Sequence, residues 1–427
     1  MDFTIIPKEE NMYTKDTLDN GIRVVTEHIP YVNSVSIGVW IANGSRNESL
    51  EESGMSHFIE HMLFKGTYKR SSKEIAESIE DIGGQLNAFT GKESTCFYAK
   101  VLDSHIDIAI DVLSDMLLNS KISNEDIEKE KGVVLEEISM YEDSPEDLAA
   151  DLLIKASWPK SSIGYPILGL NDTLKEFNRE KILDYMNKHY SPDNTVISVA
   201  GNFNREKLFK LLSEKFGSWT NKGINSNYDK PTLNKSTLIK QKDIEQVHIC
   251  LGLNGIEIGN DDIYTLLAIN NIFGGGTSSR LFQRVREEKG LAYSIYSYPS
   301  SYKNTGIFSI YAGINMQNFY DAISIIKNEI ENLTDKGIDE IQLEKSKEQL
   351  KGNYILGLES TSSRMFGIGK SELITNKVHE PAEILQKIND VTMKDVERVI
   401  DNVFGDGIIS GSIVGKLGKN IDIDGLL

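Results

Sequence analysis

The second half of this 427-residue chain repeats short stretches of the first half, and this repeat limits the folds that the sequence can adopt. The Gly-Thr pair at 276–277 follows an apolar, helix-like stretch, as the Gly-Thr pair at 66–67 does 210 residues earlier. A few residues later, Gly290 parallels Gly84 at a spacing of 206 residues. Repeats of about 200 residues indicate duplicated domains rather than a solenoid of short units. The alternative is a pair of unrelated α+β domains.

One segment of the first half has the spacing of a metal-binding helix. His57 and His61 are four residues apart, which places both imidazoles on one face of a helix. Two such imidazoles can share one Zn²⁺, and Glu60 would then lie beside the ion. The order His-x-x-Glu-His is the inverted form of the zincin motif. The alternative is an amphipathic helix with two satisfied histidines, whose core side includes Phe58 and Met62.

A catalytic zinc site needs a third protein ligand, and a second predicted helix supplies a candidate. Read as a helix, residues 127–141 place Glu130 and Glu137 on an otherwise apolar stripe that ends at Tyr141. Glu136 points about 100° away from this stripe, toward solvent. A carboxylate that faces inward needs a cation or hydrogen-bond donors, and a metal ion would supply the charge. We therefore predict Glu137 as the third ligand.

Glu130 lies two turns before Glu137 on the same face of this helix. It is a candidate for orienting a metal ligand or for handling protons. The alternative is one more charged residue on a helix that carries several.

The second half keeps the predicted helix but not the metal ligands. At a spacing of 210 residues, the positions that correspond to the metal motif hold Leu267, Asn270 and Asn271. Residues 217–236 are rich in Asn, Lys, Gly and Ser, and this composition indicates a linker. We therefore predict a catalytic zinc-binding domain at 1–216, the linker at 217–236, and a homologous, substrate-holding domain without metal ligands at 237–427.

These motifs together resemble those of the pitrilysin family of zinc peptidases. The resemblance is strongest to the short-chain branch that contains the mitochondrial processing peptidase β subunit and its bacterial relatives. Besides the metal motif, the similar segments are residues 64–67, 84–90 and 130–137. The resemblance extends over nearly the whole chain. It implies an α+β fold of two homologous domains, each a mainly antiparallel sheet covered by helices, which together form one half of a clam-like peptidase.

The metal motif and the resemblance lead to the same expected activity. One Zn²⁺ per chain, held by His57, His61 and Glu137, leaves a coordination position for water. Glu60 would take the proton as that water attacks a peptide carbonyl. The expected function is a zinc-dependent endopeptidase that hydrolyses peptide bonds in peptides or in unfolded, extended segments.

An extended substrate needs a partner for its main chain, and an exposed sheet edge is the simplest one. Asn87, Ala88 and Phe89 match the residues of the family's edge strand, and the resemblance implies that they bind substrate. The alternative is an ordinary internal strand.

Arg286 and Tyr293 resemble the family's Arg-x₆-Tyr block, which implies that they hold the region of the scissile carbonyl. In the family, four domains close around a peptide, whereas this chain has two. The resemblance therefore implies a partner half, which is a second copy in a homodimer or a paralogue in a heterodimer. Arg286 and Tyr293 would then act on the partner's zinc. The glycine loop at 274–276 is short, unlike the long glycine-rich loop of the mitochondrial non-catalytic subunit.

The charge balance opposes some other classes of partner. The formal net charge is −18, from 46 basic and 64 acidic residues, which disfavours nucleic acid and anionic membranes. No apolar run approaches membrane-spanning length, and the first ten residues lack the layout of a signal or transit peptide. The cytoplasm is the expected location. Cys96 and Cys250 lie far apart in apolar runs, and we expect both to be buried as small apolar side chains rather than joined in a disulfide.

Two other functions compete with the peptidase. A peptide-binding or assembly subunit without catalysis would usually lose a ligand or the glutamate, and here all four positions are present. A structural zinc protein would need a fourth ligand, and no Cys or further His lies near the motif. The donor set also suits Fe, Mn or Co. The sequence names neither the physiological substrate nor the cleavage-site preference nor the pathway.

Overall fold

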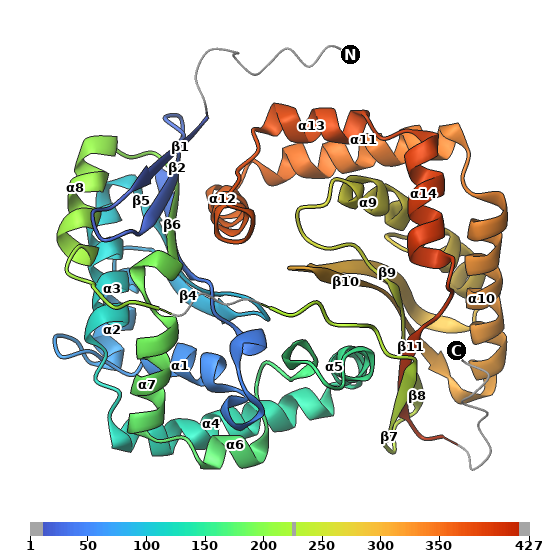
Figure 1. Cartoon of the computed structure of the whole chain (residues 1–427), viewed down its shortest axis with the longest axis horizontal. Coiled ribbons are helices and arrows are strands. Elements are labelled where there is room, and N and C mark those ends of the chain that lie inside the picture. Colours follow the sequence, from blue (N-terminus) through green and yellow to red (C-terminus); the bar gives the residue numbers. More distant parts are fainter. Residues whose placement is uncertain (1–11, 224–227, 418–427) are drawn as a thin grey trace. The chain divides into compact units, whose positions relative to one another are not determined.

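The structure is a computed structural model of the chain, in which residues 12–223 and 228–417 are described (Figure 1). The first ten residues and positions 224–227 of the predicted linker lie outside the described residues. By its packing, the chain divides into two units. The first unit comprises Met1–Ile138, Tyr165–Asn227 and Ile355–Ala382, and the second Ser139–Gly164, Tyr228–Tyr354 and Glu383–Leu427.

The first unit is built on a six-stranded sheet in the order β1-β2-β6-β3-β5-β4. All neighbouring strands are antiparallel except β2 and β6, which run parallel. The strand β4 is therefore the last strand on one side. The strands are β1 (Tyr13–Thr17), β2 (Arg23–His28), β3 (Ser34–Ile41), β4 (Gln85–Thr90), β5 (Thr95–Leu102) and β6 (Thr195–Gly201).

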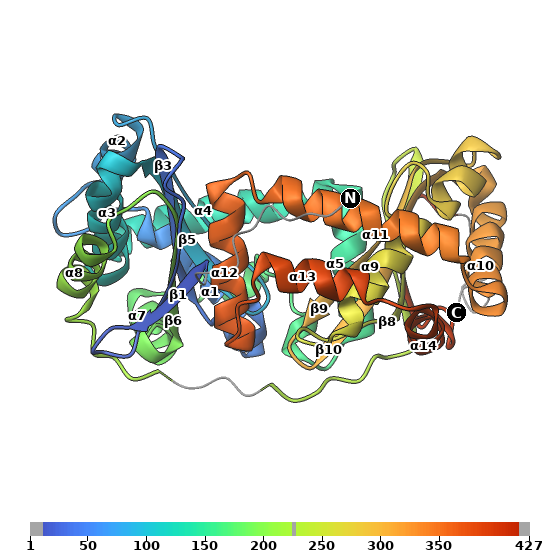
Figure 2. The ribbon, with the colours of Figure 1, turned by 90° about the horizontal axis from the view of Figure 1, so that it is seen from above.

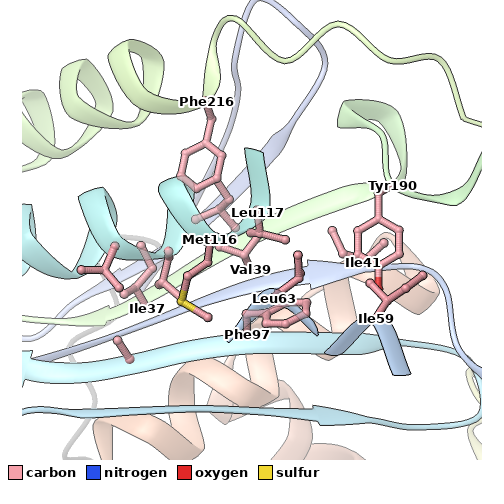
Figure 3. Packing of buried hydrophobic residues seen from close by; sticks show 14 of the residues in the cluster. Ile37, Val39, Ile41, Ile59, Leu63, Phe97, Met116, Leu117, Tyr190 and Phe216 are labelled. Carbon is pink, nitrogen blue, oxygen red and sulfur yellow. The ribbon is translucent and has the colours of Figure 1, made fainter. Parts of the chain in front are cut away.

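Helices α3 (Ile106–Asn119) and α8 (Arg205–Phe216) lie on one side of this sheet and α12 (Thr361–Thr375) on the other, in both views (Figures 1 and 2). The core forms where apolar side chains of β3 meet those of the covering helices (Figure 3). Ile37, Val39 and Ile41 come from β3, and Met116 and Leu117 from α3. The other helices of this part of the chain are α1 (Met55–Leu63), α2 (Ser72–Glu80), α4 (Asn124–Asp143), α6 (Asn171–Lys175) and α7 (Arg179–His189).

The second unit repeats this architecture with a five-stranded sheet in the order β7-β11-β8-β10-β9. Among the described strands of this unit, the one parallel pair is β7 with β11, which corresponds to β2 with β6, so both sheets share order and strand direction. The strands are β7 (Ser236–Gln241), β8 (Gln246–Asn254), β9 (Ala292–Tyr302), β10 (Thr305–Asn315) and β11 (Ser410–Gly415). The helices are α5 (Pro145–Ser157), α9 (Asp262–Phe273), η6 (Phe282–Glu287), α10 (Phe319–Lys336), α11 (Glu340–Gly357), α13 (Pro381–Asn389) and α14 (Met393–Phe404). The predicted α+β fold with two mainly antiparallel sheets is thus confirmed.

Each sheet has its second face covered by a helix from the other half of the sequence. In the first unit, Ile368 and Leu373 of α12 pack on the face that carries Val25, Trp40 and Cys96. In the second unit, α5 covers the equivalent face of the sheet through Ala149 and Leu153, next to Cys250. The predicted domains follow chain order, whereas the packing assigns residues 139–164 to the second unit and 355–382 to the first. Sequence order cannot show this, because an apolar helix face does not identify its partner sheet.

Several local signals correspond closely to the structure. The sequence places Ser71 three residues before Glu74 and Thr392 three residues before Asp395, which is the spacing of a capping box, and these residues cap α2 and α14. Both cysteines are buried and free, as expected. One expectation about burial was wrong: Tyr141, placed on the inward stripe of α4, is 41% exposed because it lies in the last turn of that helix. Within the described ranges, no helix has both the length and the apolar character needed to cross a membrane.

The contact of α12 with the first sheet is close enough to be tested by adding one methyl group. A Cβ at Gly369 would lie 2.2 Å from Trp40 Nε1, whereas a Cβ at Gly367 on the same helix would meet nothing within 4 Å. We expect Gly369→Ala to lower the free energy of unfolding by about 1–3 kcal/mol through overpacking. The control Gly367→Ala should raise it by up to about 1 kcal/mol through helix propensity. Urea unfolding midpoints measure both, and equal shifts would contradict the tight docking of α12.

Candidate metal centre

Helix α1 is fixed at its start by a buried carboxylate and along its length by apolar packing. Glu48 accepts hydrogen bonds from the backbone N–H groups of Gly54 and Ser56, both at 2.8 Å. These are N–H groups that the first turn of a helix leaves without intrahelical partners. Burial raises the pKa of Glu48 to about 7 despite these hydrogen bonds. Phe58, one residue after His57 on α1, is completely buried, so the helix cannot rotate without exposing its core side.

The two histidines lie next to each other on α1, as their spacing predicts. Their ring centroids are 4.5 Å apart. His57 is buried, and the side chain of His61 is 22% exposed. His57 therefore faces the interior, whereas His61 is partly open to solvent.

Helix α4 brings Glu137 to this pair. Glu137 Oε2 lies 3.3 Å from His61 Nε2 and 3.7 Å from His57 Nε2. Ligand atoms that surround a tetrahedral zinc ion at about 2.0–2.2 Å are roughly 3.3–3.6 Å apart, which these two distances match closely. In the described part of the chain, these three residues form the one group of at least three His, Cys, Asp or Glu side chains placed to hold a metal ion. Glu136, next in sequence, is exposed as predicted.

Glu130, one of the predicted site residues, lies behind His61. Its Oε1 is 2.8 Å from His61 Nδ1, and its Oε2 is 2.6 Å from Lys65 Nζ. A carboxylate on Nδ1 directs the other ring nitrogen toward a metal, which is the usual arrangement around metal-binding histidines. Glu130 is 2% exposed, so the alternative of one more solvated charge on the helix does not hold. Nδ1 of His57 is buried without a hydrogen-bond partner among the described residues.

The electrostatic surroundings separate the two imidazoles. Burial and the neighbouring His61 lower the pKa of His57 to about 4. Burial acts to lower the pKa of His61 as well, but its hydrogen bonds to Glu130 and Glu137 outweigh this effect and raise the pKa to about 9. At neutral pH and without metal, His57 is therefore neutral and His61 carries a proton. A metal ion would take the place of that proton, since ligation requires the neutral imidazole.

Glu60 is placed beside the ligands rather than among them. It is half-buried, and Thr90 Oγ1 donates a short hydrogen bond to its Oε2. Burial raises the pKa of Glu60, and the hydrogen bond from Thr90 only partly opposes this effect. A carboxylate with a raised pKa is suited to accept and return a proton near neutral pH. Sequence reasoning missed Thr90 and Lys65 as parts of the site, although both lie in segments that carry the family resemblance.

The predicted substrate strand lies at the edge of its sheet. Among the described residues β4 pairs with β5 alone, so the alternative of an internal strand does not hold. Asn87 and Phe89 are exposed, while Ala88 is half-buried against the core. The ring of Phe89 packs against three aromatic residues on the α12 side of the sheet, which are Trp40, Tyr98 and Phe366.

A cavity of about 420 Å³ lies between α2 and β4. Its lining includes Phe64, Ile75, Leu86, Asn87 and Tyr98. The cavity therefore adjoins the edge strand that carries Asn87.

Arg286 and Tyr293 belong to the second unit, whereas the metal ligands belong to the first. Arg286 lies in η6, and its guanidinium carbon is 5.5 Å from the ring centroid of Tyr293, at the start of β9. Tyr293 is 72% exposed. These two predicted site residues are therefore in contact with each other. Helix α9, which corresponds to α1, carries Asn270 and Asn271 in place of Glu60 and His61.

Comparison with known proteins identifies the class. The family model described as insulinase (peptidase family M16) matches residues 23–170, and the one described as peptidase M16 inactive domain matches residues 176–350. The chain is 48% identical to a Bacillus subtilis protein named uncharacterized zinc protease YmxG, over 92% of this chain and 96% of that protein. It is 38% identical to a Streptomyces coelicolor protein named uncharacterized zinc protease SCO5738, over 94% and 90% of the two chains. The chain belongs to the M16, or pitrilysin, family of peptidases.

Solved structures share the fold. A protease from Helicobacter pylori superposes with a TM-score of 0.87 at 24% identity, covering 94% of this chain and 99% of the other. A peptidase M16 inactive domain from Pseudomonas fluorescens gives the same TM-score at 16% identity, covering 96% and 100%. At these identities the similarity establishes the fold alone.

The adjacent glutamates 136 and 137 provide a matched test of the third ligand. We expect Glu137→Gln to weaken zinc binding by more than the ~10–100-fold that loss of an outer-shell partner costs. Glu136→Gln removes the same charge from an exposed position and should leave the affinity unchanged. Competition with a chromogenic chelator measures both affinities, and equal losses would show that only the local charge matters.

Proposed function

We propose that this protein is a zinc-dependent endopeptidase that cleaves peptides or extended segments of unfolded polypeptides. The observation that carries the proposal is the convergence of three donor atoms, from His57, His61 and Glu137, with Glu60 beside them. The names of the relatives, zinc proteases, support the choice of metal. With three ligands from the protein, a zinc site keeps a position for water or substrate, as catalytic sites do.

Bound zinc would supply a Lewis acid at the carbonyl and a water of lowered pKa. The protein supplies the proton transfer. Thr90 holds Oε2 of Glu60, so Oε1 is the atom proposed to take the proton from the attacking water and to return it to the leaving amine. Glu130 holds His61 through Nδ1, so Nε2 would be the ring nitrogen that binds the ion.

The substrate is proposed to bind as an additional strand along β4. An edge strand offers unpaired main-chain groups, and pairing with them reads little sequence. Asn87, Ala88 and Phe89 are the residues proposed to make these contacts. The cavity beside β4 would then accept a side chain of the bound peptide, since alternate side chains of an added strand point to opposite faces.

A partner half is part of the proposal. Arg286 and Tyr293 are proposed to hold the substrate carbonyl at the zinc of a partner, which is a second copy of this chain or a paralogue. A chain with all four metal-site residues favours the homodimer, because each copy could be active and could complete the other.

The second candidate function is a peptide-binding or assembly subunit without catalysis. The solved structure described as an M16 inactive domain keeps this possibility open. The presence of His57, His61, Glu137 and Glu60 in a competent arrangement favours the enzyme.

Glu60→Gln separates the two candidates. The amide cannot take a proton, so we expect peptide hydrolysis to fall by about 10²–10⁴-fold or more, while zinc stays bound. Cleavage of a mixed peptide library, read by mass spectrometry, measures the activity, and metal analysis of the purified protein measures zinc. The matched control is Glu136→Gln. Full activity in the Glu60 variant would refute the assignment, as would a wild-type protein that binds zinc but cleaves nothing.

Mixing two inactive variants tests the homodimer. One variant carries Glu60→Gln, and the other carries Arg286→Ala with Tyr293→Phe. In a mixed dimer, the intact Glu60 of one copy meets the intact Arg286 and Tyr293 of the other, so about a quarter of the wild-type activity should return after random pairing. Light scattering gives the oligomeric state. A dimer whose mixed variants stay inactive would contradict this shared site.

A further inference from the structure

The buried carboxylate of Glu130 has two oxygens, and each is held by a different partner. His61 Nδ1 lies 2.8 Å from Oε1, and Lys65 Nζ lies 2.6 Å from Oε2. His61, Glu130 and Lys65 thus form a continuous row that starts at a metal ligand. The side chain of Glu130 is only 3% exposed, whereas that of Lys65 is 33% exposed.

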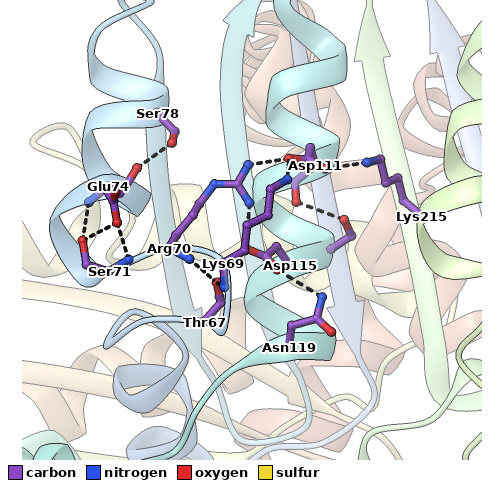
Figure 4. Close-up of polar contacts among 11 residues, drawn as sticks. Thr67, Lys69, Arg70, Ser71, Glu74, Ser78, Asp111, Asp115, Asn119 and Lys215 are labelled. Carbon is purple, nitrogen blue, oxygen red and sulfur yellow. Dashed lines mark hydrogen bonds and ion pairs between the residues drawn. The ribbon is translucent and has the colours of Figure 1, made fainter.

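Lys65 is itself held in place by the segment that follows α1. Thr67 Oγ1 donates to Asp115 Oδ2 at 2.7 Å, and Arg70 reaches both Asp111 and Asp115 on α3 (Figure 4). Lys215 of α8 also donates to Asp111, at 2.5 Å. This network holds the segment after α1 against α3, and α3 against α8. The backbone of Lys65, which lies in that segment, is therefore fixed in position.

We propose that Lys65 is a positioning residue of the metal site: it holds the Glu130 carboxylate in the orientation in which the other oxygen fixes the ring of His61. The inference rests on the proposed zinc site and extends it by one residue. Lys65 touches neither the ion nor the substrate in this role, and it acts only through Glu130.

The physical reason is that one hydrogen bond leaves a carboxylate free to turn about its last side-chain bond. Two donors on opposite oxygens define its plane, and the ring of His61 follows that plane. When zinc is bound, His61 is neutral, and Lys65 is then the cation in direct contact with the buried Glu130. If Glu130 lost Lys65, its carboxylate would turn toward other hydrogen-bond donors, because an unpaired buried charge is costly.

A merely structural ion pair would behave differently. Removing Lys65 takes a partner from a buried carboxylate, which costs stability whether or not the pair serves the metal site. The distinguishing measurements are therefore the zinc affinity and the NMR signals of His61, which loss of a merely structural pair would leave unchanged.

Three variants of the full-length protein test the proposal. Lys65→Met removes the donor and keeps the length of the side chain, and Lys65→Arg restores a donor. The control Lys69→Met removes the same charge from the same loop, where Lys69 contacts Asp111 and not Glu130. Zinc affinity is measured by chelator competition, and the ¹⁵N shifts of His61 report which ring nitrogen carries the proton.

We expect Lys65→Met to weaken zinc binding by about 3- to 10-fold, less than the ~10–100-fold that loss of a direct outer-shell partner costs. The Nδ1–H signal of zinc-bound His61 should move toward that of an unpaired imidazole. Lys65→Arg should recover most of the affinity, and Lys69→Met should stay within about twofold of the wild type.

The proposal is overturned if Lys65→Met keeps wild-type zinc affinity and His61 shifts, or if Lys69→Met weakens binding equally. A wild-type protein in which zinc leaves the His57 and His61 signals unchanged would overturn the metal site and this inference together. A wild-type protein that binds zinc at both histidines but hydrolyses no peptide would refute the proposed function alone.

Discussion

The contact between α1 and α4 is the constraint on which the candidate site depends. Helix α1 presents two imidazoles, and α4 presents two carboxylates one above the other, so that Glu130 meets His61 at Nδ1 and Glu137 meets both rings at Nε2. Glu130 is buried, and its charge would be costly to bury without the contacts to His61 and Lys65. Glu48 at the start of α1 and the apolar side of that helix keep the imidazoles turned toward α4.

The same contact explains why two histidines on one helix have opposite acid–base behaviour. His57 is buried beside a second imidazole, and its pKa falls, whereas His61 bridges two carboxylates, and its pKa rises. In the metal-free protein, the positive charge of protonated His61 compensates the negative charges of Glu130 and Glu137, as a bound metal ion would. Metal binding would therefore release the proton from His61, so the affinity for the metal depends on pH.

Each half of the sequence supplies a helix that covers the sheet formed by the other half. Helix α12 comes from the second half of the sequence and covers the first sheet, where Phe366 packs against Phe89 of the edge strand. Helix α5 comes directly after α4 in the first half and covers the second sheet. A side chain more than 270 residues from Phe89 in the sequence, Phe366, thus supports the strand proposed to bind substrate. Buried ion pairs such as Arg364 with Glu27 add to this contact.

The sequence by itself determined the local features, because they depend on spacing along one helix or strand. These include the pairing of His57 with His61, the exposure of Glu136 beside Glu137, the caps of α2 and α14, and the duplication. The tertiary structure alone decided which sheet each of α5 and α12 covers, that β4 is an edge, and that Lys65 and Thr90 complete the polar contacts of the site. The physical reason is that periodicity shows which face of an element is apolar or charged, but not which distant element will meet that face.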